Sequence, residues 1–167
     1  LEILTAQPTL QDQKEIPHHL YGFLDPSESC SAGKWISLVC MEIDKALSEG
    51  RTPIVVGGTG FYLKTLLEGL SPIPPIPSEV REDLLNQNQS QLSFYEDLQN
   101  IDPDLAMKIH PENKQRILRG LEVYYGTGKP LSYWQSQKPQ APAYSFEKYL
   151  LMPSKETLDV RIFKRLE

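Results

Sequence analysis

The sequence has few of the residues that build disulfide frameworks and metal centres. Only two cysteines occur among 167 residues, and Cys30 and Cys40 do not form a Cys-x-x-Cys pair. Three histidines are present, with His18 next to His19 and His110 far along the chain. This pattern favours two reduced thiols over a disulfide scaffold. It gives no support to a zinc site or another histidine-based metal site.

Long hydrophobic runs are also missing from the sequence. No apolar stretch approaches the ~20 residues of a membrane-spanning helix, and residues 1–4 have neither the basic start nor the apolar run of a signal peptide. With 40% hydrophobic and 23% charged residues, the composition is that of an ordinary globular protein. We therefore expect a folded cytoplasmic protein with no membrane partner.

The sequence also lacks an excess of positive charge. The net charge of −5 argues against a protein that coats nucleic acid by bulk electrostatics. The stretch 108–119 reverses that sign and predicts a local basic face. Its charged residues and its histidine are Lys108, His110, Glu112, Lys114, Arg116 and Arg119.

The order of predicted elements indicates an α/β fold. Ser31 is placed to cap a helix that ends near Gly50, and the apolar, β-branched run 53–56 reads as a strand covered on both faces. A helix over 61–70 follows, and 146–152 reads as a second buried strand. This alternation predicts part of a parallel α/β sheet. Residues before 31, interrupted by prolines, are expected to be irregular.

Four prolines between positions 72 and 77 predict a stiff connector and a domain boundary. Beyond it the pattern predicts only helices, near 78, at 92–98, after Asp102-Pro103, at 112–126 and at 131–137. We therefore assign 72–138 to a small inserted helical domain, and 1–71 with 139–167 to parts of the α/β core. A last helix, capped by Ser154, is expected to run on to residue 167, which suggests truncation there.

The turn Gly57-Gly58-Thr59-Gly60 is the first candidate for chemistry. A glycine-rich turn after a buried strand lets the backbone approach a ligand closely. The Thr59 hydroxyl could contact a reacting group or merely cap the next helix. The turn is not a phosphate-binding P-loop, because Leu63 stands where that motif requires glycine before Lys64.

Basic side chains on two predicted helices are the other candidates. Gln115, Arg116 and Arg119 lie on the polar side of the helix at 112–125, where they could be a solvated face or could contact phosphates and a base edge. Arg161 and Arg165 are spaced i, i+4 and could clamp an anion or simply keep the surface polar.

A series of short motifs, in order along essentially the whole chain, resembles the tRNA dimethylallyltransferase family. The motifs are Thr5-Ala6-Gln7-Pro8, Pro17-His18-His19-Leu20, Asp25-Pro26, Ser31-Ala32, Val56-Gly57-Gly58-Thr59-Gly60-Phe61-Tyr62, Leu67-Glu68-Gly69-Leu70, Ile109-His110-Pro111, Gln115-Arg116, Arg119-Gly120-Leu121-Glu122-Val123-Tyr124 and Thr127-Gly128-Lys129-Pro130-Leu131-Ser132.

The resemblance implies a prenyl transferase that acts on tRNA. In that family an α/β core with a parallel sheet of the P-loop type binds dimethylallyl diphosphate with Mg²⁺, and a helical insertion grips the anticodon stem-loop. The prenyl group goes to the N6 amine of the adenosine 3′ of the anticodon, which is flipped out of its stack.

The resemblance also implies roles for residues. It places Thr59 at the reaction channel, with Gly57 and Gly58 beside the substrate. Contacts to tRNA would come from Arg81 and from the run containing Gln115, Arg116 and Arg119. Arg161 and Arg165 would contact the diphosphate.

The departures from the family pattern matter as well. The family's diphosphate-binding loop, its general base and the Mg²⁺ ligands lie outside this chain, while Gln7 and Tyr21-Gly22 replace common family residues. We therefore expect a monomeric central fragment that is inactive alone. Two alternatives stay open: an adenylate prenyltransferase acting on a free nucleotide, which would not need the helical block, and a tRNA-binding module without catalysis.

Overall fold

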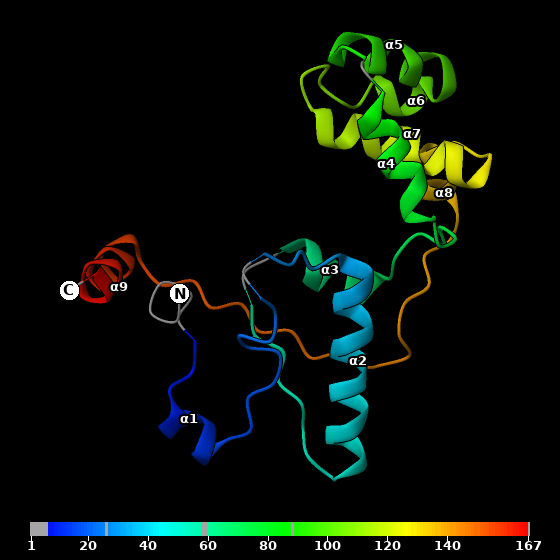
Figure 1. Ribbon diagram of the computed structural model, residues 1–167. Helices are drawn as coiled ribbons and strands as arrows, with labels where there is room; N and C mark the ends of the chain where they lie inside the picture. Colours follow the sequence, from blue (N-terminus) through cyan, green and yellow to red (C-terminus); the bar gives the residue numbers. More distant parts are fainter. Residues whose placement is uncertain (1–6, 26, 58–59, 88, 167) are drawn as a thin grey trace. The chain divides into compact units, whose positions relative to one another are not determined.

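The structure is a computed structural model that describes residues 7–25, 27–57, 60–87 and 89–166 (Figure 1). The chain divides into two compact units. One, which we call the split unit, is made of Leu1–Leu67 and Pro142–Glu167. The other, which we call the helical unit, is Glu68–Ala141.

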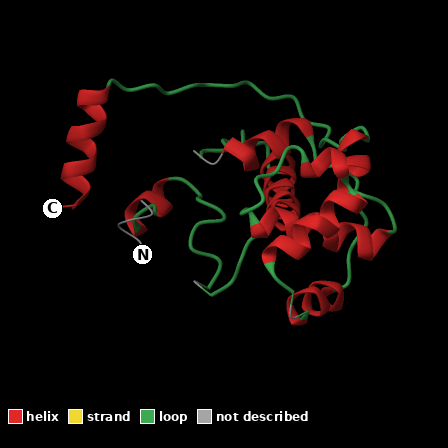
Figure 2. Cartoon of the chain, turned by 90° about the horizontal axis from the view of Figure 1, so that it is seen from above, coloured by secondary structure: helices red, strands yellow, loops and turns green. Residues whose placement is uncertain are grey.

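The prediction of a parallel sheet is wrong for the described residues. None of them forms a strand (Figure 2), and their one β-type pairing is an isolated antiparallel bridge between Leu70 and Gln140. The segments 53–56 and 146–152 are irregular, and Ile54 and Leu151 are 83% and 90% exposed. An apolar, β-branched run becomes a strand only when a neighbouring strand shares its backbone hydrogen bonds. No described segment pairs with either run.

The helical unit contains five of the helices in the described residues. They gather into one bundle, drawn in green to yellow in Figure 1. Their shared core holds eleven buried residues and includes Leu98, Ile117, Leu121 and Val123, each with no exposed surface. The helices are α4 (Ser78–Asn86), α5 (Gln91–Ile101), α6 (Pro103–Ala106), α7 (Lys114–Thr127) and α8 (Leu131–Ser136).

Helix α7 is central to this bundle, and α4, α5 and α8 all pack on it. Asn113 caps its start by accepting a hydrogen bond from the Arg116 amide at 3.2 Å. Gly128, with φ of 71°, ends it in the left-handed conformation that glycine adopts without strain. Gly120 brings α7 close to α5 and α6, because a β-carbon there would lie 2.7 Å from Leu98 Cδ1.

Asp102 joins two further helices of the bundle. Its Oδ1 accepts from the Leu105 amide at 3.1 Å and so caps α6. Its Oδ2 accepts from the Ser132 amide at 2.9 Å, in the first turn of α8, which has no cap from its own N-cap residue. The carboxylate is almost fully buried, so both oxygens need these donors.

The split unit contains α1 (Leu10–Glu15), α2 (Ala32–Ser48), most of α3 (Gly60–Glu68) and α9 (Lys155–Leu166). Its cluster of buried residues is small: Val39, Ile43 and Leu66, with partly buried side chains around them. The Ser31 cap of α2 is confirmed, since its hydroxyl accepts from the Lys34 amide at 3.1 Å. None of the helices in the described ranges combines the length and apolar character needed to cross a bilayer.

Helix α1 corrects the expectation that the N-terminal residues are irregular. Thr9 and Asp12 form a reciprocal capping box, in which the Asp12 carboxylate accepts from the Thr9 amide at 2.8 Å. The Thr9 hydroxyl accepts from the Asp12 amide at 3.2 Å. The Thr9 hydroxyl, which also donates to Asp12 Oδ2 at 2.7 Å, and the Thr9 amide hold the pKa of Asp12 below its usual value.

Candidate nucleic-acid interface

Two of the predicted tRNA-contacting arginines meet at one carboxylate in the helical unit. Arg119 on α7 donates from Nη1 to Glu122 Oε1 at 2.9 Å. Arg81 on α4 donates from Nη1 to Glu122 Oε2 at 3.2 Å. We call Arg81 and Arg119 the arginine pair. Each oxygen of Glu122 therefore holds one guanidinium, and the two guanidiniums come from different helices.

Burial divides this cluster into an inner anion and outer cations. The Glu122 side chain is 11% exposed, whereas the side chains of Arg81 and Arg119 are 49% and 44% exposed. Leu121 and Val123, on either side of Glu122, are buried in the core. The backbone of α7 thus anchors the carboxylate, and the guanidiniums reach outward from it.

The other two predicted contacts on α7 are also exposed. Gln115 and Arg116 lie in its first turn, four and three residues before Arg119. Residues at these spacings share one side of a helix. The structure therefore brings Arg81, Gln115, Arg116 and Arg119 onto one region of the helical unit.

The remaining site predictions fall on the split unit. Arg161 and Arg165 are exposed on α9, and within the described residues neither forms an ion pair. Gly57 is exposed. Gly58 and Thr59 lie outside the described residues, so their predicted roles stay predictions.

The helix that follows the glycine turn is fixed to α2. The Tyr62 hydroxyl donates to the Cys30 carbonyl oxygen at 2.6 Å. Its ring stacks on Trp35, with 5.1 Å between the ring centres and 16° between their planes. On the other side of the turn, Val55 packs against the buried cluster of the split unit. Both flanks of the turn are therefore held by packing.

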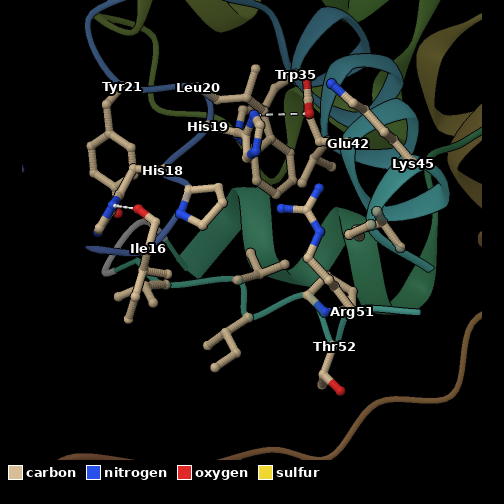
Figure 3. A pocket seen from close by; sticks show the side chains of 18 residues that line it. Ile16, His18, His19, Leu20, Tyr21, Trp35, Glu42, Lys45, Arg51 and Thr52 are labelled. Carbon is tan, nitrogen blue, oxygen red and sulfur yellow. Dashed lines mark hydrogen bonds and ion pairs between the residues drawn. The ribbon is translucent and has the colours of Figure 1, made fainter. Parts of the chain in front are cut away.

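A pocket of about 480 Å³ in the split unit was not predicted from the sequence (Figure 3). His19 Nδ1 lies 3.0 Å from Glu42 Oε2, and the His18 ring contacts the Ile16 carbonyl oxygen at 2.7 Å. Arg51 points into the pocket and pairs with Glu49. Charged side chains of both signs line this pocket. In the sequence, only the adjacent histidines could have indicated a site in this part of the chain.

Glu122 was also missed by reasoning from the sequence. Its spacing of three residues from Arg119 could have indicated a pair on one helix face. The contact with Arg81 could not have been found that way, because 41 residues separate the two in the chain.

The described residues do not fit a magnesium site. Among them, no group of three or more histidine, cysteine, aspartate or glutamate side chains lies close enough together to hold a metal ion. Mg²⁺ takes oxygen ligands, mainly carboxylates and water. No step is therefore assigned to a metal held by these residues.

Comparison with known proteins decides the family. The family model described as "IPP transferase" matches residues 1–167. The chain belongs to the IPP transferase family. The resemblance found in the sequence motifs is thereby confirmed.

Named relatives of this IPP transferase chain agree with the match. It is 40% identical to a tRNA dimethylallyltransferase of Azorhizobium caulinodans, over 100% of this chain and 55% of that protein. It is 43% identical to one of Zymomonas mobilis, over 100% of this chain and 54% of that protein. The chain spans about half the length of the curated relatives it matches.

A solved structure matches the fold of this IPP transferase chain. It is that of a eukaryotic dimethylallyltransferase acting on tRNA, with a TM-score of 0.69 and 33% identity. The match covers 84% of this chain and 36% of that chain.

Proposed function

We propose that this protein is a tRNA dimethylallyltransferase. It would transfer the dimethylallyl group of dimethylallyl diphosphate to the N6 amine of the adenosine 3′ of the anticodon. Residues 72–138 would hold the anticodon stem-loop, and residues 1–71 and 139–167 would belong to the catalytic part. The family match along the whole chain carries the proposal, and the eukaryotic relative that acts on tRNA supports it.

The arginine pair, with Gln115 and Arg116, supports tRNA as the substrate. Guanidiniums bind phosphate oxygens through several N–H groups, and an amide side chain can read a base edge. The chain as a whole is acidic, with a net charge of −5. A local cationic surface on an acidic protein favours a specific contact over general nucleic-acid coating.

The chemistry of transfer divides between proton removal and charge stabilisation. The amine must lose a proton to a base, and cations must absorb the charge on the departing diphosphate. Arg161 and Arg165 are our candidates for the diphosphate, and Thr59, with Gly57 and Gly58, for the reaction channel. A monomeric state and a cytoplasmic location stay predictions.

A binding titration tests the tRNA assignment. A fluorescent anticodon stem-loop is titrated with the chain, and then with the double variant Arg116→Ala, Arg119→Ala. Loss of the phosphate contacts of two guanidiniums predicts binding weaker by about ten-fold or more. The variant should also reduce the dependence of affinity on salt.

The matched control removes the same charge from the split unit. Lys34 and Arg51 are exposed cations that pair with Glu28 and Glu49. The double variant Lys34→Ala, Arg51→Ala should bind within about two-fold of the parent chain. Absence of binding by the parent chain, or an equal loss in both double variants, would contradict the tRNA assignment.

A further inference from the structure

We infer that Glu122 is a positioning residue that holds Arg81 and Arg119 as one clamp for a phosphate group of the RNA backbone. This inference rests on the proposed function, because it needs the helical unit to bind tRNA. It assigns a role in RNA binding to an acidic side chain, which by its charge alone would repel RNA.

The geometry gives the clamp its shape. One oxygen of Glu122 accepts from each guanidinium, at 2.9 Å from Arg119 and 3.2 Å from Arg81. The described residues offer neither guanidinium a second acceptor at hydrogen-bond distance, so most of its N–H groups stay available. Two guanidiniums fixed on a shared carboxylate present their remaining donors from neighbouring positions, as binding to a phosphate requires.

The balance of charge fits a single phosphate. Two guanidiniums and one carboxylate leave one net positive charge at the cluster. A bound phosphodiester would neutralise that charge, and it would do so at the half-exposed side of the cluster, since Glu122 itself is buried. The inner carboxylate and an outer phosphate would thus hold the arginine pair between them.

The Glu122 carboxylate restricts the rotamers of the two arginines, and this restriction gives it a role in binding as well as in stability. A free arginine on the surface loses rotamer freedom when it binds a ligand. An arginine already held by a buried acid has lost much of that freedom on folding. A buried ion pair is also weak evidence for a stabilising role, because apolar residues of similar size often serve stability as well. Preorganisation is therefore the function that the arrangement supports.

The decisive experiment compares Glu122→Gln with Glu112→Gln in the same stem-loop titration. Both variants remove one negative charge from the same region, but the Glu112 side chain is exposed and contacts neither arginine. Bulk electrostatics predicts that both bind RNA more tightly. Our inference predicts that E122Q binds about ten-fold more weakly, since the amide holds the arginine pair less firmly, whereas E112Q binds equally or more tightly.

A double-mutant cycle separates positioning from a structural effect. Arg81→Ala should weaken binding strongly in the parent chain and much less in the E122Q background, because the clamp is already loose there. Thermal melting of each variant checks that the helical unit remains folded. If E122Q unfolds, Glu122→Asp takes its place: it keeps the charge, and its shorter side chain cannot hold both guanidiniums where the glutamate holds them.

Each outcome decides the matter. Weaker binding by E122Q, or by E122D where E122Q unfolds, supports the clamp. Tighter or unchanged binding by that variant, or an R81A effect that is the same in both backgrounds, overturns it. If the parent chain binds and the Arg116→Ala, Arg119→Ala variant does not, the proposed function stands even when the clamp fails. If the parent chain does not bind the stem-loop, both fail.

Discussion

The helical unit and the split unit differ in how much apolar surface they bury. Among the described residues, the helical unit buries eleven core residues in one cluster, and the split unit buries three. The split unit also leaves large apolar side chains in solvent, including Ile54, Val56, Leu150 and Met152. Hydrophobic burial is the main favourable term in folding. The arginine pair therefore stands on the better packed of the two units.

The largest expected effect comes from the centre of the helical core. Leu98 on α5 is 0% exposed, so Leu98→Ala should cost about 3 kcal/mol of unfolding free energy. Hydrogen exchange should become faster throughout α5 and α7. The control is Leu92→Ala on the same helix, where the leucine is 63% exposed and the cost should stay below about 0.5 kcal/mol. Equal losses in both variants would mean that the helical unit lacks the core described here.

Asp102→Asn should have the next largest effect. The amide would turn a donor toward one of the two backbone amides that the carboxylate now accepts from, and a buried unsatisfied group costs about 2 kcal/mol. Urea denaturation should register the loss. Asp104→Asn, at an exposed position in α6, should change stability by less than about 0.5 kcal/mol. A matching loss at Asp104 would rule out the shared cap as the cause.

Replacing one glycine in each unit should give changes of opposite sign. Gly120→Ala adds a β-carbon 2.7 Å from Leu98 Cδ1 and 2.8 Å from Leu105 Cδ2, and overpacking should outweigh helix propensity by about 1 kcal/mol. Gly33→Ala in α2 meets only Ser31 Oγ, at 3.9 Å, so it should stabilise by about 0.5 kcal/mol. Melting temperatures measure both changes. A gain in stability at Gly120 would show that α7 has room against α5.

The last prediction concerns a hydrogen bond beside the small buried cluster of the split unit. The Tyr144 hydroxyl donates to Asp44 Oδ1 at 2.7 Å, and burial, together with this bond, raises the pKa of Tyr144. A raised pKa means that the bond contributes fully below the ordinary value of about 10 and is lost only as pH rises beyond it. Tyr144→Phe should therefore cost roughly 1 kcal/mol at neutral pH. The free energy of unfolding of the parent chain is measured from neutral to alkaline pH. If it does not fall as pH rises, that result would contradict this role.

The sequence predicted the helices after residue 31 well because their signals are local, whereas α1 was missed. Ser31 caps α2 as its position indicated, a helix follows Asp102-Pro103 as expected, and Arg116 and Arg119 lie on an exposed side of α7. The run 53–56 was misjudged, because strand formation depends on a partner that composition does not reveal.

The candidate site was only partly predictable for the same reason. The arginines could be named from their motifs, and their exposure follows from the helix period. Their common partner could not be named, because α4 and α7 meet only in the folded bundle. The pocket beside His19 likewise depends on packing between segments distant in sequence.

The most direct test of RNA binding by the helical unit is an NMR titration of the labelled chain with an anticodon stem-loop. We predict that the guanidinium signals of Arg81 and Arg119 shift on binding, together with the amides of Gln115 and Arg116, and that the signals of α1 do not. Shifts confined to the split unit, with the arginine pair unchanged, would contradict the assignment of tRNA binding to the helical unit.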